Sequence, residues 1–102
     1  MENINKLICY LIAIQNFAKD IHYSCKGDDF YSKHLFADRI YDGLDTFIDG
    51  IKETCLLGND ILPLPSGEYL AKAMNLLPAL EQDDKKNFEA MQKLLIDCLV
   101  LM

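Results

Sequence analysis

Apolar side chains recur at steps of three and four residues along most of this 102-residue chain. An α-helix turns once in 3.6 residues, so residues at these steps share one helical face. The pattern is clear over residues 4–22, again over 29–57 and again over 83–102. The spacing therefore predicts an all-α fold.

Glycines divide the pattern into separate helices. The first helix is expected to end near Lys26 and Gly27, where glycine accepts the left-handed backbone that closes a helix, and Asp28 or Asp29 can cap the next one. The second helix is expected to run without a break over residues 29–57. Its apolar stripe comprises Leu35, Phe36, Ile40, Leu44, Phe47, Ile48, Ile51 and Cys55.

Residues 59–67 are expected to form a connection, because Pro63 and Pro65 lack the N–H donor that a helix needs. Ser66 is the expected N-cap of a short helix over residues 68–77. A final helix over residues 83–102 has acidic residues in its first turn, where the helix dipole favours them. Met74, Met91 and the Phe and Leu stripes are expected in the core.

The size of the chain predicts a single domain spanning residues 1–102. A domain this small buries only part of its unfolded surface, so a partner subunit is a plausible way to complete its core. The chain has 16 acidic and 10 basic residues and a net charge of −6. Since affinity for nucleic acid comes from Lys and Arg on phosphates, we expect no nucleic-acid partner.

The four cysteines, Cys9, Cys25, Cys55 and Cys98, form no C-x-x-C pair. This spacing favours reduced core residues over a zinc knuckle or a redox motif, with a disulfide framework in a secreted chain as the alternative. The N-terminal segment lacks the basic region and cleavage site of a signal peptide and is too interrupted to span a membrane. We therefore expect a soluble, cytoplasmic protein.

Two histidines and three carboxylates carry the chemistry. His34 and Asp38 are four residues apart, as are Asp49 and Glu53, so each pair projects from one helical face. His22 lies near the end of the first helix. Imidazole with carboxylate is a ligand mix that suits iron better than calcium or structural zinc. The pattern predicts an iron site.

One chain cannot complete this site. Asp38 and Asp49 are eleven residues apart, which at about 1.5 Å per residue separates them by roughly 16 Å. If two copies of the second helix pack antiparallel about a two-fold axis near Gly43, the His34 end of one meets the Glu53 end of the other. The spacing thus predicts a homodimer through the second helix, with two equivalent sites.

Residues 17–58 resemble the first helical pair of the Dps family, the miniferritins of the ferritin-like superfamily. The family signature is two histidines twelve residues apart, then an aspartate four later, an aspartate eleven later and a glutamate four later. Lys26-Gly27-x-x-Phe30 resembles the family's turn, and Tyr23 stands where the family usually has tryptophan. The signature falls without a gap on His22, His34, Asp38, Asp49 and Glu53.

The resemblance implies oxidation of Fe(II), typically by hydrogen peroxide, and storage of ferric mineral in a hollow homo-oligomer. It also implies that the histidines come from one subunit and the later acids from its mate, and that Tyr23 could accept an oxidising equivalent. The chain departs from the family in length: residues 60–80 resemble the short connecting helix, 83–102 the third helix, and no fourth follows. The basic tail of some members is also missing.

The expected fold is therefore a truncated, all-α ferritin-like bundle: two long antiparallel helices, a short connecting helix and a third helix. Two other interpretations stay open. Asp42 and Asp45 lie near the proposed ligands, so the acids could form a solvated stripe without activity. The chain could also be a non-catalytic helical scaffold in a larger assembly, because a truncated bundle leaves apolar surface uncovered. Iron and manganese are not distinguished.

Overall fold

The computed structural model describes residues 2–27 and 30–102, and these contain helices and no strand. The expected all-α class is confirmed. The elements are α1 (Glu2–Ser24), α2 (Phe30–Asp42), α3 (Leu44–Ile51), the π-helical segment η1 (Lys52–Leu56), the 3₁₀ segment η2 (Leu57–Asn59), α4 (Ser66–Leu76) and α5 (Asp84–Leu101).

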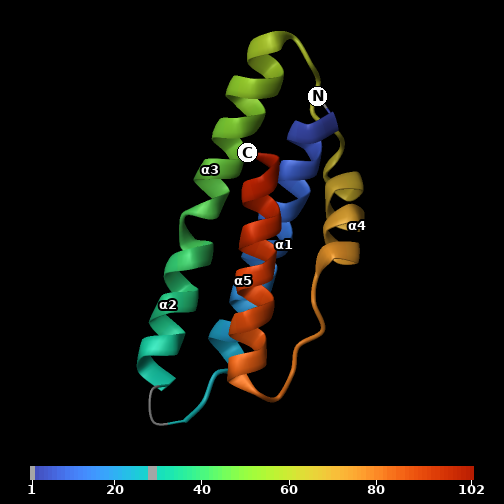
Figure 1. Ribbon diagram of the computed structural model, residues 1–102. Coiled ribbons are helices and arrows are strands. Elements are labelled where there is room, and N and C mark those ends of the chain that lie inside the picture. The colour runs from blue at the N-terminus through green and yellow to red at the C-terminus, as the bar shows by residue number, and fades with distance from the viewer. Residues whose placement is uncertain (1, 28–29) are drawn as a thin grey trace.

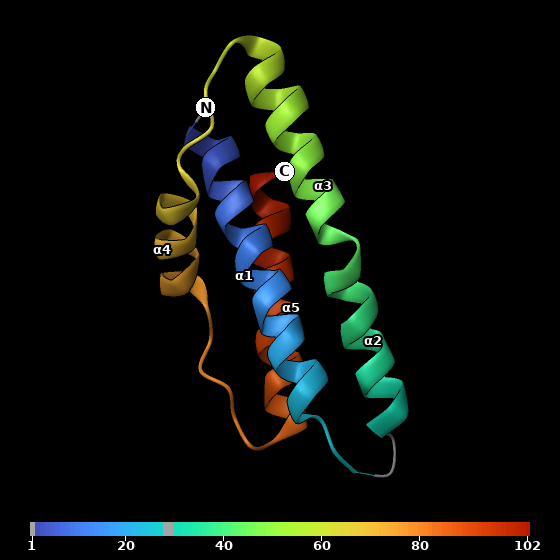
Figure 2. The same cartoon turned by 180° about the vertical axis from the view of Figure 1, so that it is seen from behind.

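The helices form an elongated bundle of 50 × 24 × 22 Å. α2 and α3 run back along α1 as one long arm, and α4 packs on another side of α1 (Figures 1 and 2). The chain then crosses the length of the bundle through residues 60–83 before α5 begins. As a result, α5 is antiparallel to α1 and runs in the same direction as α2 and α3.

α1 is the central helix because α2, α3, α4 and α5 all contact it. Contacts on several sides explain why its apolar residues extend beyond a single stripe. Phe17, Ile8 and Ala18 have no exposed surface. The buried residues of α1 are Ile8, Cys9, Leu11, Ile12, Ala13, Ile14, Gln15, Phe17, Ala18 and Ile21.

The prediction of an unbroken second helix was wrong. The helix is interrupted at Gly43, which separates α2 from α3. After Ile51 the backbone widens into the π-helical turn of η1 and then tightens into η2. The arm ends in a left-handed residue, Asp60 with φ 59°, rather than at Gly58. Sequence periodicity does not reveal a change from an α-helix to a π- or 3₁₀-helical turn, because the apolar spacing stays compatible with a helix.

The apolar stripe of this arm is less buried than its pattern predicts. Ile48 is buried, but Phe36 and Phe47 are 52% and 45% exposed. Met74 of α4, predicted in the core, is 73% exposed, whereas Met91 of α5 is buried as predicted. The reason is that α1 covers only one side of each neighbouring helix, so apolar residues on the flanks lie outside the contact.

The ends of the helices agree only in part with expectation. Gly27 has a φ of 99°, the left-handed conformation expected after the first helix. Ser66 does not cap α4: it is the first helical residue, and Pro65 holds the cap position with an extended backbone. At α5 the Asp83 carboxylate caps the helix by accepting from the Lys85 N–H. The proposed caps Asp28 and Asp29 lie outside the described residues.

The cysteines lie where a reduced core predicts them. Cys9 and Cys98 are buried free thiols, and Cys55 is a half-buried one. Cys25 is buried beside the α1–α2 turn, where its Sγ is 3.8 Å from the His22 carbonyl oxygen and 3.9 Å from that of Phe30. Burial raises the pKa of both Cys9 and Cys98. These thiols therefore act as small apolar groups.

Asp84 ties the start of α5 to the α1–α2 turn. Its Oδ2 accepts from the backbone N–H of Lys26 at 2.9 Å and from Lys33 Nζ at 3.0 Å. These two donors hold the pKa of Asp84 below its ordinary value. The carboxylate thus joins the start of α5 to the α1–α2 turn and to α2, which lie 58 and 51 residues away in the sequence.

Replacing Asp84 with asparagine should lower the free energy of unfolding by about 1 kcal/mol at neutral pH, since charged hydrogen bonds are lost. A depressed folded pKa stabilises the fold above the unfolded pKa, and this stability is lost as pH falls through the folded pKa. Urea unfolding at pH 7 and at pH 3 checks this. The difference between parent and D84N should shrink at the lower pH; an equal difference at both would contradict it.

Candidate metal site

The turn between α1 and α2 places the two histidines side by side. His22 lies in the last turn of α1, whose carbonyl oxygens have no partner within the helix. His34 lies in the second turn of α2. The two helices are antiparallel and in contact, so the spacing of twelve positions from His22 to His34 brings their side chains together.

The imidazole rings of His22 and His34 are stacked, with centroids 3.6 Å apart and planes inclined by 25°. His22 Nδ1 lies 3.1 Å from the carbonyl oxygen of His34, and His34 Nδ1 lies 2.8 Å from that of His22. A carbonyl oxygen can only accept, so each Nδ1 must carry the proton. In the neutral rings both Nε2 atoms then keep a lone pair, the form in which histidine binds a metal.

Aromatic rings flank this half-buried pair. Phe30 stacks on His34 with centroids 5.1 Å apart. Tyr23 and Tyr41 approach His22 edge-on, at 4.9 Å and 5.4 Å. Tyr23 is 79% exposed, so its hydroxyl reaches solvent. Two phenol rings therefore stand next to the histidine pair.

Tyr41 also connects His22 to the first carboxylate. Its hydroxyl donates a hydrogen bond to the Asp38 carboxylate, and this hydrogen bond raises the pKa of Tyr41. The ammonium group of Lys19 lies 5.6 Å from the centre of the same ring. Tyr41 is a neighbour that the ligand spacing did not indicate, although its position three residues after Asp38 places it on an adjacent helical face.

The later carboxylates lie elsewhere in the chain. Asp49 and Glu53 are exposed, Asp49 on α3 and Glu53 in the π-helical turn. Asp49 lines an open cavity of about 530 Å³ between α1, α3 and α4. In the same cavity the Gln15 amide donates to Asp45 Oδ1 at 2.5 Å. The acids of this face are thus presented to solvent on an accessible surface.

One chain does not assemble a complete set of ligands. Within residues 2–27 and 30–102, no three His, Cys, Asp or Glu side chains gather closely enough to hold a metal ion. The structure brings His22 and His34 together, leaves Asp38 beside Tyr41, and places Asp49 and Glu53 farther along the arm. The second-copy arrangement predicted from the sequence stays a prediction.

Comparison with protein-family models, with curated proteins and with solved structures finds no match to this chain. Among the described helices, none is long and apolar enough to cross a membrane.

Proposed function

We propose that this protein binds Fe(II) and oxidises it at a site shared by two copies of the chain, as ferritin-like proteins of the Dps kind do. The observation that carries the proposal is the His22–His34 pair. Reciprocal hydrogen bonds to backbone carbonyl groups orient both rings and leave both Nε2 atoms for a metal ion. Such carbonyl partners are the usual outer support of metal-binding histidines.

The remaining ligands are proposed to come from the second copy. His34 and Glu53 lie equally far in sequence from the midpoint between Gly43 and Leu44, and so do Asp38 and Asp49. A two-fold axis at this midpoint would place His34 of one copy opposite Glu53 of the other, and Asp38 opposite Asp49. Gly43 and Gly50 leave open space where a Cβ would project, so neither obstructs a close approach.

The connectivity also supports a ferritin-like bundle. In that architecture one long crossover joins the two halves of the bundle, so the helices before and after it run in the same direction. Residues 60–83 form such a crossover, with α4 within it, between α3 and α5. In the proposed fold, α1, the α2–α3 arm and α5 are three long helices of such a bundle.

The reaction needs little from the protein besides positioning. Each hydrogen peroxide molecule accepts two electrons, one from each of two Fe(II) ions, takes up two protons and leaves two water molecules. Carboxylates favour the harder ferric product, and imidazole contributes to the affinity for Fe(II). Tyr23 and Tyr41 would take up a stray oxidising equivalent beside the site.

An anaerobic Fe(II) titration followed by addition of peroxide tests the proposal. We expect saturable binding, and a fast rise in ferric absorbance, in the parent. Glu53→Gln should lower the oxidation rate at least about tenfold, because it replaces a negatively charged carboxylate ligand with a neutral amide. Glu89→Gln, an exposed glutamate on α5, is the matched control and should behave as the parent.

The alternative is a metal-free helical scaffold. The exposed apolar side chains of α3, α4 and α5 favour it, since such surface marks a contact with another protein. Fe(II) binding no stronger in the parent than in the Glu53→Gln variant would support the scaffold and contradict the iron site.

A further inference from the structure

A cavity of about 590 Å³ lies between the first half of α1 and α4. The two helices are in contact and run side by side in the same direction (Figures 1 and 2). Leu64, Leu76 and the buried thiol of Cys9 give the cavity an apolar wall. Small-molecule sites in proteins typically have volumes of about 300–1,000 Å³ and combine an apolar lining with a few polar groups. This cavity has the size and the lining of such a site.

Two lysines give the middle of the cavity a positive charge. Lys6 of α1 and Lys72 of α4 both line it, and neither forms an ion pair within residues 2–27 and 30–102. The ammonium group of Lys72 lies towards α1: burial raises the pKa of Cys9, and the charge of Lys72 partly opposes this rise. The chain has 16 acidic and only 10 basic residues, so two unpaired lysines at one cavity favour an anionic ligand.

Asn5 adds a hydrogen-bond donor in a fixed orientation. The buried Tyr69 hydroxyl accepts from the Leu64 N–H at 3.1 Å, so it donates its own proton to Asn5 Oδ1, at 2.7 Å. Because Oδ1 is engaged, the amide N–H groups of Asn5 are left for the cavity that this residue lines. A donor that is oriented before the ligand arrives costs little ordering entropy on binding.

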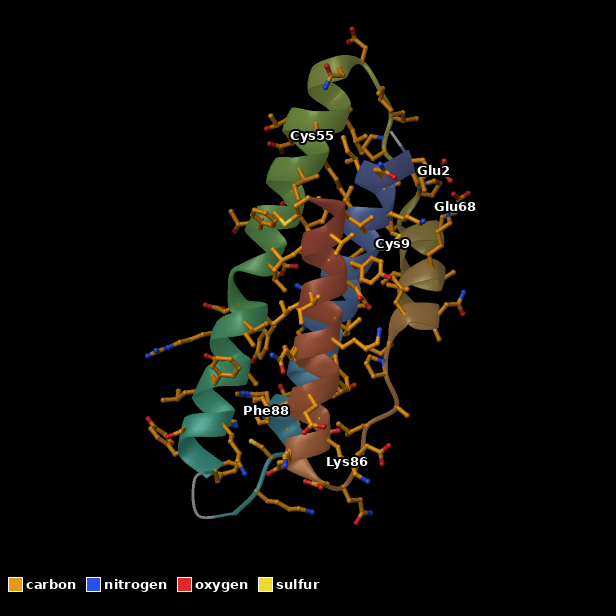
Figure 3. All side chains as sticks on the ribbon, in the orientation of Figure 1. Glu2, Cys9, Cys55, Glu68, Lys86 and Phe88 are labelled. Carbon is orange, nitrogen blue, oxygen red and sulfur yellow. The ribbon has the colours of Figure 1, made fainter. Side chains whose placement is uncertain are left out.

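The acidic side chains near the cavity lie at one end of it or are already paired. Glu2 lines the cavity, and Glu68 lies at the same end, where α1 and α4 begin (Figure 3). Asp97 lines a neighbouring cavity with Lys6, but its carboxylate pairs with Lys93 at 3.1 Å. Positive charge therefore dominates only in the middle of the cavity. This arrangement favours a ligand with a single negative charge over a polyanion.

We propose that this cavity binds a small organic acid as its carboxylate anion. The carboxylate accepts hydrogen bonds from Lys6, Lys72 and the Asn5 amide, and a short apolar body packs on Leu64 and Leu76. Two carboxylate oxygens offer enough lone pairs for these three donors. A phosphate dianion would bring a second negative charge close to Glu2. No proposed iron ligand lines the cavity, so the inference does not depend on the iron site.

Titration of the parent with hexanoate, hexanol and hexylamine tests the proposal, because the three probes share one apolar body and differ in the charge of the head group. Amide chemical shifts in NMR spectra measure each dissociation constant and locate the probe. Hexanoate should bind at least about fivefold more tightly than hexanol, since charged hydrogen bonds are stronger than neutral ones. Hexylamine should bind most weakly. The shifted signals should belong to the first half of α1 and to α4.

Lys72→Gln should lower the affinity for hexanoate to that for hexanol and leave the affinity for hexanol unchanged. Lys72 is exposed, so circular dichroism should show an unchanged helix content. Lys86→Gln is the matched control, because it removes the same charge from an exposed residue at the other end of the bundle (Figure 3). It should bind hexanoate as the parent does.

Asn5→Asp tests the oriented donor separately. Aspartate keeps an oxygen acceptor for the Tyr69 hydroxyl but replaces the amide donor with a negative charge. The affinity for hexanoate should fall at least about tenfold, because like charges repel. Equal affinity of the parent for all three probes, or a preference for hexylamine, would overturn the proposal. Parental affinity for hexanoate in both Lys72→Gln and Asn5→Asp would overturn it as well.

Discussion

Replacing His34 with alanine should lower the affinity for Fe(II) at least about tenfold, or about 1.4 kcal/mol. The substitution removes one Nε2 lone pair. It also removes the contact of His34 Nδ1 with the His22 carbonyl oxygen and the ring that stacks on His22, whereas the His34 carbonyl oxygen that faces His22 Nδ1 stays in place. Anaerobic equilibrium titration of parent and variant measures the loss.

His34→Asn separates binding from structure. Asparagine keeps a side-chain N–H donor for the His22 carbonyl oxygen, but it has no imidazole lone pair for a metal. We therefore expect a helix content close to that of the parent and an affinity for Fe(II) as low as in His34→Ala. Fe(II) affinity at the parental level in His34→Asn would show that the histidine pair only stabilises the α1–α2 turn.

Phe17→Ala should lower the free energy of unfolding by about 3–5 kcal/mol, a loss large enough to unfold much of a small domain. Phe17 is fully buried in α1, the helix that α2, α3, α4 and α5 all contact. Removing its ring leaves a cavity at the centre of the bundle that neighbouring side chains fill only in part. Urea unfolding followed by circular dichroism measures the change.

Tyr31→Ala is the control for that substitution. Tyr31 lies on α2 and is 70% exposed, so its loss should change the free energy of unfolding by no more than about 0.5 kcal/mol. A loss as small for Phe17→Ala would contradict the central position of α1 in the core.

The sequence predicts the helices well because their apolar spacing is long and regular. The ends of α1, α4 and α5 lie within two residues of expectation, and Gly27 adopts the backbone expected of it. The break at Gly43 and the π-helical turn after Ile51 were not predictable, because neither disturbs the three- and four-residue steps. A π-helical turn at Glu53 also changes the direction in which this carboxylate points, which the four-residue spacing from Asp49 does not anticipate.

For the candidate site, spacing predicted His22 and His34 as metal ligands; the structure places their rings 3.6 Å apart, and ligation stays a prediction. It could not identify the reciprocal carbonyl contacts or the Tyr41–Asp38 bond, which depend on how α1 and α2 pack. The exposure of Phe36, Phe47 and Met74 could not be predicted either, because an apolar pattern gives no indication of how many neighbouring helices cover a helix.

Mixing His34→Ala with Glu53→Ala tests most directly whether two copies share the site. Each variant alone should oxidise Fe(II) poorly. After unfolding and refolding together at equal amounts, half of the dimers contain one copy of each variant. In these, one of the two sites has both His34 and Glu53 intact. We therefore predict recovery of about a quarter of the parent rate. No recovery, in a mixture shown to contain mixed dimers, would contradict a site built from two copies.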